Sequence, residues 1–118
     1  LLASIKSVLR QERLLEMVLV DTGTPLDMLA RLQQMTLTEP RLRIITATEG
    51  MRYATACNLG ANEAGGEFLA FLNPDCLLPP DALKAITGEL NKDTQNVLAG
   101  SIILNPDTSI RETCRTVP

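Results

Sequence analysis

The stretch MVLVDTGT, residues 17–24, shows most clearly how this chain folds. Its four apolar residues make a short run, rich in β-branched side chains, that predicts a buried β-strand. The polar and glycine-bearing residues at 21–24 are typical of a turn. Pro25 then suits the first turn of a helix, and Thr24 is the candidate N-cap.

Outward from this stretch, helices and strands alternate along the whole chain. Strands are predicted over residues 17–20, 42–46, 68–72 and 97–104, with a further extended segment over residues 109–117. The four predicted helices have inner faces formed by Leu1, Ile5 and Val8, by Leu26, Leu29 and Ala30, by Ala54, Cys57, Ala61 and Ala64, and by Leu83, Ile86 and Leu90. This alternation, with short connections, predicts an α/β fold with a mostly parallel sheet flanked by helices.

Glycines mark two places in the third predicted helix, residues 52–64. Gly60 lies in its interior, where glycine costs about 1 kcal/mol relative to alanine, so we expect the helix to approach the sheet closely there. Gly65 and Gly66 are predicted to end the helix. The next run, residues 68–72, is continuously apolar, as in a strand covered on both faces.

Composition limits the possible functions. The chain has 118 residues, of which 45% are apolar and 21% charged, as in one folded domain. The net charge of −3 offers no basic surface to a nucleic-acid backbone, so nucleic-acid binding is not expected. Because the sequence has no histidine, histidine-dependent triads and most transition-metal sites are excluded from this stretch. Chemistry must come from carboxylates, amides, arginines and backbone groups.

Cysteine content and hydropathy favour a cytoplasmic location, including the inner face of the membrane. Cys57, Cys76 and Cys114 are odd in number and lack a CxxC spacing, which indicates reduced thiols used in packing. No apolar run approaches the roughly 20 residues of a membrane span, and the N-terminus does not resemble a signal peptide. The chain has no initiating methionine and begins in a helix, so we expect it to be part of a longer enzyme.

Polar residues gather where the predicted strands end. Asp21 follows the first strand, Arg52 follows the second, and Asn73-Pro74-Asp75 follows the third. Because the carboxyl ends of parallel strands share one edge, and open α/β folds bind ligands at that edge, we expect Asp21, Arg52 and Asp75 to converge.

Each of these residues also has a structural interpretation. Asp21 suits a helix cap about as well as a ligand contact, and on composition alone Asn73-Pro74-Asp75 suits a turn better than a site. A carboxylate there also suits a hard cation that bridges phosphates. An arginine in the first turn of a helix opposes the helix dipole, which favours an anion-binding role for Arg52. The other acidic residues near these points, Glu49, Asp81 and Glu89, are interpreted as surface charges or caps.

Three segments together resemble the inverting glycosyltransferases of family 2, which have the GT-A fold. VDTGT at 20–24 is similar to the family pattern V-D-[ND]-[GC]-S. EGMRYATACNLG at 49–60 is similar to N-x-G-x-x-x-A-x-N-x-G, and AGGEFLAFLNPD at 64–75 is similar to A-x-G-E-[FY]-[LI]-x-F-L-[ND]-x-D. The segments occur in order over about the first two thirds of the chain, and the Asn-Pro-Asp form resembles the rhamnosyltransferase-like subset.

The resemblance implies a Rossmann-like GT-A fold for nucleotide-diphospho-sugar transfer, with residues 1–118 as its nucleotide-sugar-binding part. At the matching positions, Asp21 would contact the base or ribose and Arg52 the diphosphate. Asn73 and Asp75 would form the D-x-D-like motif. Asp75 would contact a divalent cation, Mg²⁺ or Mn²⁺, that neutralises the leaving nucleoside diphosphate.

The implied reaction moves a sugar, of the hexosyl type, from a nucleotide diphosphate sugar to a saccharide or lipid-linked acceptor in bacterial cell-surface polysaccharide synthesis. The family carries its general base on a later acidic motif, expected beyond Pro118, so the chain alone is expected to be inactive. Two other functions stay open: a nucleotide-binding module that catalyses no transfer, and a sugar nucleotidyltransferase. A dehydrogenase is not expected because no G-x-G-x-x-G follows a strand.

The sequence also departs from the family pattern. The family's opening strand, which lies in the middle of its sheet, has no counterpart here. Thr22, the residues before Gly50, and Thr108, where the pattern has glycine, also differ. Without a central strand, the neighbouring strands would expose unpaired backbone groups, which predicts low stability and homo-oligomers formed through the sheet edges.

Overall fold

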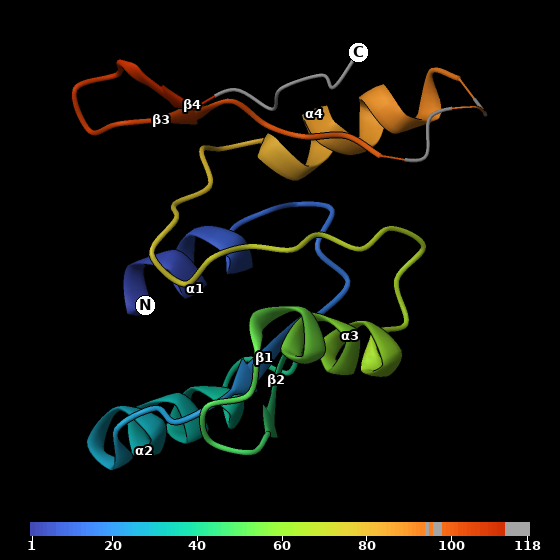
Figure 1. Ribbon diagram of the computed structural model, residues 1–118. Coiled ribbons are helices and arrows are strands. Elements are labelled where there is room, and N and C mark those ends of the chain that lie inside the picture. Colours follow the sequence, from blue (N-terminus) through green and yellow to red (C-terminus); the bar gives the residue numbers. More distant parts are fainter. Residues whose placement is uncertain (94, 96–97, 113–118) are drawn as a thin grey trace.

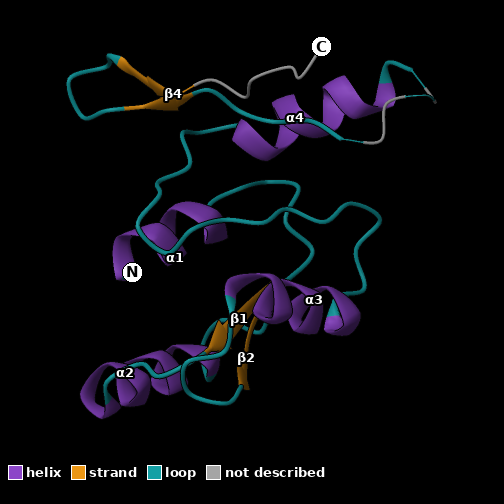
Figure 2. Ribbon diagram, in the orientation of Figure 1, coloured by secondary structure: helices purple, strands orange, loops and turns teal. Residues whose placement is uncertain are grey.

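The computed structural model describes residues 1–93, 95 and 98–112. Helices and strands alternate as far as the third helix, and a fourth helix and a small hairpin follow (Figures 1 and 2). The elements are α1 (Leu2–Leu9), β1 (Met17–Asp21), α2 (Leu26–Thr36), β2 (Leu42–Thr46), α3 (Tyr53–Glu63), α4 (Ala82–Asn91), β3 (Ile103–Leu104) and β4 (Ile110–Glu112). This order confirms the predicted α/β class.

β1 and β2 form a parallel two-stranded sheet, with α2 as the crossover between them. The register runs from Met17 opposite Leu42 to Asp21 opposite Thr46, so the two strands start and end at the same level. One more hydrogen bond, 2.8 Å from the Ala47 N–H to the Asp21 carbonyl oxygen, extends the ladder past the last pair. The loops that follow the two strands therefore leave the sheet side by side.

The core lies where α1 and α2 meet this sheet. Ile5 of α1, Leu32 of α2 and Leu42 of β2 are buried in one cluster. Partly buried apolar side chains surround the cluster: Leu2, Leu9, Met17, Leu19, Met28, Met35 and Ile44. Spacings of three and four residues place these side chains on one face of each helix.

The cap predicted for α2 is wrong, and so are two of the three residues predicted for its inner face, although Leu29 is half-buried. Leu26 and Ala30 are exposed, because the helix begins at Leu26 and presents to the core the row that contains Leu32. The N-cap residue is Pro25 rather than Thr24, and no side chain caps the helix. In α1, by contrast, Ile5 and Val8 are buried as predicted.

α3 lies against β1, and Gly60 is the point of closest approach that the sequence predicted. A Cβ atom on Gly60 would lie only 3.1 Å from Cγ2 of Val20, so an ordinary side chain has little room there. Cys57, Ala61 and Ala64 are half-buried on this side as expected, whereas Ala54 is exposed. The helix ends at Glu63, before the two glycines, with Ala64 in an extended conformation.

Residues 68–72 do not form the predicted strand. A strand needs a neighbour that supplies backbone hydrogen bonds, and among the described residues β1 pairs with β2 alone. The run is consequently irregular and partly exposed, with 58% of the Phe71 surface accessible. Figure 1 shows the chain leaving α3, running back to α1 and then turning to α4.

The last described residues form an antiparallel hairpin rather than further strands of the parallel sheet. β3 covers only Ile103–Leu104 of the predicted strand 97–104, and β4 covers Ile110–Glu112 of the predicted extended segment. The turn between them contains Thr108 with φ 67°, in the left-handed region where the family pattern has glycine. Residue 97, residues 113–117 and Cys114 lie outside the described residues.

Candidate functional site

The loops that follow β1 and β2 contact each other at the carboxyl edge of the sheet through a hydrogen bond and close packing. The Gly50 N–H donates a 3.2 Å hydrogen bond to the Thr22 carbonyl oxygen. Gly23 (φ 128°) and Gly50 (φ 74°) both have backbone conformations that favour glycine. A Cβ atom on Gly23 would also lie 3.2 Å from Cγ of Glu49, so the loops pack closely at this point. The two loops therefore hold each other in place.

Asp21, the last residue of β1, braces its own loop. Only 6% of its surface is exposed, and its Oδ1 accepts hydrogen bonds from the N–H groups of Thr24 (2.7 Å) and Gly23 (3.1 Å). The Thr24 amide, the Thr24 side chain and the Gly23 amide lower the pKa of the Asp21 carboxyl, and burial opposes them. The carboxylate is thus ionised at neutral pH.

This geometry excludes Asp21 as the cap of α2. The helix begins at Leu26, whereas the amides that donate hydrogen bonds to Asp21 belong to Gly23 and Thr24 in the preceding loop. The contact of Asp21 with a nucleotide base or ribose stays a prediction. The sequence identified Asp21 as a fixed polar group at the edge of the sheet, and its place at that edge is as expected.

Arg52 lies at the same edge, two residues after Gly50. It is the N-cap residue of α3 rather than part of the first helical turn, and its carbonyl oxygen accepts the 3.0 Å hydrogen bond from the Ala56 N–H. The guanidinium is exposed and, among the described residues, makes no hydrogen bond or ion pair. The first turn of α3 has neither an acidic residue nor a side-chain cap. A positive charge and free helix N–H groups therefore lie together.

Asn73-Pro74-Asp75 forms a turn, as its composition favours. The Cys76 N–H donates to the Asn73 carbonyl oxygen at 3.1 Å, and all three residues of the motif are exposed. The one described hydrogen bond to the Asp75 carboxylate is long, 3.8 Å from Cys76 Sγ. Because residues 68–72 form no strand, the motif does not follow a strand end, and among the described residues no hydrogen bond or ion pair joins it to Asp21 or Arg52. The structure thus links Asp21 and Arg52 through their loops but leaves Asp75 apart.

The sequence analysis did not predict a role for Ser7 in α1 or for Gln11, which lies just after α1. The Ser7 Oγ accepts a 3.0 Å hydrogen bond from the Leu78 N–H, and the Gln11 amide contacts Pro79 and Leu83. All three of these partners come after Asp75 in the sequence. The available signal was the spacing of four between Ser7 and Gln11, which would place the two polar side chains on one side if the helical turn continued past Leu9.

A separate polar cluster joins the opposite end of the sheet to the end of α3. Glu16, just before β1, accepts hydrogen bonds from the Gly65 N–H (2.6 Å) and from Arg43 Nη1 (3.0 Å). Arg43 also donates to the carbonyl oxygen and the carboxylate of Glu63. The Gly65 amide first, and then Arg43, lower the pKa of the Glu16 carboxyl. This cluster connects the two strands to α3, and its one guanidinium, on Arg43, is paired with both carboxylates.

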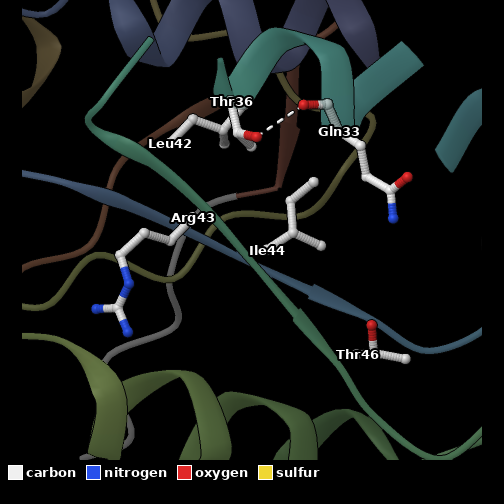
Figure 3. A pocket seen from close by; sticks show the side chains of 6 residues that line it. All are labelled: Gln33, Thr36, Leu42, Arg43, Ile44 and Thr46. Atoms are coloured by element: carbon white, nitrogen blue, oxygen red, sulfur yellow. Dashed lines mark hydrogen bonds between the residues drawn. The ribbon is translucent and has the colours of Figure 1, made fainter. Parts of the chain in front are cut away.

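The structure also has an open hollow beside β2, of about 390 Å³, shown in Figure 3. It is lined by Gln33, Thr36, Leu42, Arg43, Ile44 and Thr46. None of the residues predicted to bind the donor lies in it, and the charge it contains, Arg43, is already paired with Glu16 and Glu63. We therefore place the candidate site at the two hydrogen-bonded loops and not in this hollow.

Two further observations limit the site. Across residues 1–93, 95 and 98–112, no three cysteine, aspartate or glutamate side chains are grouped so that they alone would hold a metal ion. Within the same residues, none of the helices has the length and apolar character needed to cross a membrane.

Parallel strands joined by helices, with polar loops at their carboxyl ends, define an α/β protein of the kind that binds ligands at that edge. The family model described as Glycosyl transferase family 2 matches residues 1–113. The chain therefore belongs to glycosyltransferase family 2, and its fold is the GT-A fold of that family. No curated protein and no solved structure matches the chain.

Proposed function

We propose that this glycosyltransferase binds a nucleotide diphosphate sugar at the carboxyl edge of the β1–β2 sheet. The observation that carries the proposal is the pair of hydrogen-bonded loops, which holds the ionised Asp21 and the exposed Arg52 at one edge. Membership of the family supports a sugar donor and an acceptor in general terms.

Each of the two side chains suits one part of such a donor. A carboxylate has about four lone-pair sites. The hydrogen bonds that Asp21 accepts from two backbone amides occupy only part of them. Asp21 would take a hydrogen bond from a ribose hydroxyl or a base N–H. The Arg52 guanidinium, beside the uncapped N-terminus of α3, would bind the diphosphate, since both present N–H donors and positive charge to phosphate oxygens.

Asp75 and Asn73 suit the metal-binding end of the donor. Mg²⁺ is usually held by one or two carboxylates together with substrate phosphates, so the exposed Asp75 carboxylate fits this role without a cluster of protein ligands. Asn73, two residues earlier in the same turn, would hydrogen-bond the diphosphate. When bound there, Mg²⁺ or Mn²⁺ would neutralise the charge that develops on the leaving nucleoside diphosphate.

The acceptor in this proposal is a saccharide or a lipid-linked saccharide of a bacterial cell-surface polysaccharide, and the sugar is a hexosyl group of the rhamnosyl-like kind. The Asn73-Pro74-Asp75 form of the motif supports that subset. Transfer would take place in the cytoplasm or at the inner face of the membrane, where nucleotide sugars and lipid-linked acceptors meet. A general base would deprotonate the acceptor hydroxyl as the sugar leaves the diphosphate.

The test is calorimetric titration of the full chain with UDP, GDP and dTDP, with and without Mn²⁺. Wild type is compared with Asp75→Ala and with Asp27→Ala, which removes an exposed carboxylate from α2 as the matched control. We expect one diphosphate to bind in a Mn²⁺-dependent way, and the Mn²⁺ dependence to disappear in Asp75→Ala alone. Failure of all three diphosphates to bind the folded protein would refute the proposal.

A further inference from the structure

Gln11 is a buried side chain whose amide nitrogen and oxygen both form hydrogen bonds to distant parts of the chain. It is 4% exposed and lies just after α1. Its Nε2 donates to the carbonyl oxygens of Ser7 (3.2 Å) and Pro79 (3.0 Å), and its Oε1 accepts from the Leu83 N–H (3.1 Å). Two of these three partners are about 70 residues away in sequence.

Ser7 adds a second connection from the same face of α1. Its Oγ donates to the Ser4 carbonyl oxygen at 2.7 Å and accepts from the Leu78 N–H at 3.0 Å. Gln11 comes four residues after Ser7, just past the end of α1, and the two side chains hydrogen-bond to the backbones of consecutive residues, Leu78 and Pro79. We refer to Ser7 and Gln11 together as the α1 bracket.

The α1 bracket is the main attachment of the segment that contains Asp75. Among the described residues, the hydrogen bonds that join residues 66–81 to distant parts of the chain are those from Ser7 and Gln11. Leu78 comes only three residues after Asp75, and the Asn73–Cys76 turn lies directly before it. Among the described residues, these hydrogen bonds, rather than the pairing of a sheet, connect the segment that carries Asp75 to the region of α1.

We propose that Ser7 and Gln11 are positioning residues for the metal-binding end of the donor site, because they hold the turn that carries Asp75. This inference rests on the proposed function, in which Asp75 contacts the cation on the diphosphate. A carboxylate on an exposed turn binds a cation more tightly when the backbone of the turn is already fixed. Otherwise the free energy of binding is reduced by the entropy lost when the turn becomes ordered. Side chains that hold a metal ligand in its orientation commonly change metal affinity by about 10- to 100-fold when they are replaced.

Gln11 also has a second, purely structural role, which the test must separate. Its Oε1 accepts the Leu83 N–H in the first turn of α4, where Asp81 has no side-chain capping bond. Because burial favours the neutral form of a carboxyl group, Gln11→Glu is measured at a pH at which its carboxyl is ionised. The carboxylate then still accepts that N–H but has no hydrogen to donate to Pro79. Gln11→Glu thus keeps the α4 cap while it breaks the connection to the Asp75 segment.

The experiment titrates UDP, GDP and dTDP into wild type, Gln11→Ala, Gln11→Glu and Ser7→Ala, each with and without Mn²⁺. The readout is the ratio of the affinities with and without the cation. We expect this ratio to fall by about 10- to 100-fold in both Gln11 variants and to fall in Ser7→Ala, while metal-free binding is unchanged. Hydrogen exchange at the Leu78 amide, which donates to Ser7 Oγ in the wild type, should also be faster in Ser7→Ala than in wild type. Val8→Ala, which loses buried apolar surface on the same helix, is the control for destabilisation and should keep the wild-type ratio.

The outcomes separate this inference from the proposed function. If folded wild type binds none of the diphosphates, both proposals fail. If the Mn²⁺ dependence disappears in Asp75→Ala but stays in the folded Gln11 variants, the function stands and the positioning role is wrong. If Val8→Ala loses the Mn²⁺ dependence as fully as Gln11→Glu, the effect comes from general destabilisation, and the inference is overturned.

Discussion

Replacing Gly60 with alanine tests how closely α3 packs on β1. Gly60 lies in the helix interior, and an added Cβ atom would be 3.1 Å from Cγ2 of Val20. Carbon atoms pack best about 3.5–4.0 Å apart, so the helix or the valine must move by a few tenths of an ångström. Gly88 in α4 is a matched control, because a Cβ atom there would meet nothing within 4 Å.

Two effects of opposite sign set the size of the change. Alanine is better than glycine in a helix interior by about 1 kcal/mol, whereas an extra methyl group forced into a packed interface costs about 1–3 kcal/mol. Gly60→Ala should therefore lower the free energy of unfolding by about 1 kcal/mol. Gly88→Ala should raise it by up to about 1 kcal/mol. Val20→Ala removes the crowding atom, so in that background Gly60→Ala should become stabilising.

Urea denaturation followed by circular dichroism measures these differences, with all five proteins compared at one pH and temperature. The decisive result is the sign of the Gly60→Ala effect in the two backgrounds, since a double-mutant cycle isolates the contact between residues 20 and 60. If Gly60→Ala stabilises the wild-type chain as much as Gly88→Ala does, the close packing of α3 on β1 is wrong.

Two further predictions concern the carboxylates that hold the loops and the sheet. Gly65 and Arg43 lower the pKa of Glu16 from its ordinary value of 4.5, so its contribution to stability is present above that pH and is lost as the pH falls through the lowered pKa. Urea midpoints of Glu16→Gln should thus depend less on pH below 4.5 than those of wild type, and parallel curves would contradict this. Asp21→Ala leaves the Gly23 and Thr24 amides without their acceptor and should cost about 1–3 kcal/mol. Asp21→Asn keeps an acceptor oxygen and should cost less, and an equal loss in both variants would disprove the bracing role.

Local patterns predicted the first half of the fold well. The apolar runs at residues 17–20 and 42–46 become the parallel pair because β-branched, apolar segments bounded by turn residues have few other ways to bury their side chains. Gly60 predicted the close approach to β1, and Asp21 and Arg52 lie at the edge where the strand ends indicated. These inferences hold because each depends on residues adjacent in sequence or on the shared edge of two consecutive strands.

The run at residues 68–72 shows where local patterns fail. Its composition is that of a buried strand, yet pairing depends on the backbone of another segment, and no strand among the described residues lies beside it. The same failure removes the reason for expecting Asp75 at the sheet edge. Two of the three residues predicted for the inner face of α2 were wrong for a smaller reason, since a shift in where the helix begins changes which residues face the core.

Periodicity, turn chemistry and the order of the motifs along the chain were enough to predict the α/β class, the parallel pair, the glycine at the helix–strand contact and the family. The bracing of its own loop by Asp21, and the attachment of the Asp75 segment to Ser7 and Gln11, became visible in the folded chain. The physical reason is that a hydrogen bond between groups about 70 residues apart depends on how the chain returns on itself, and no local pattern of residues encodes that path.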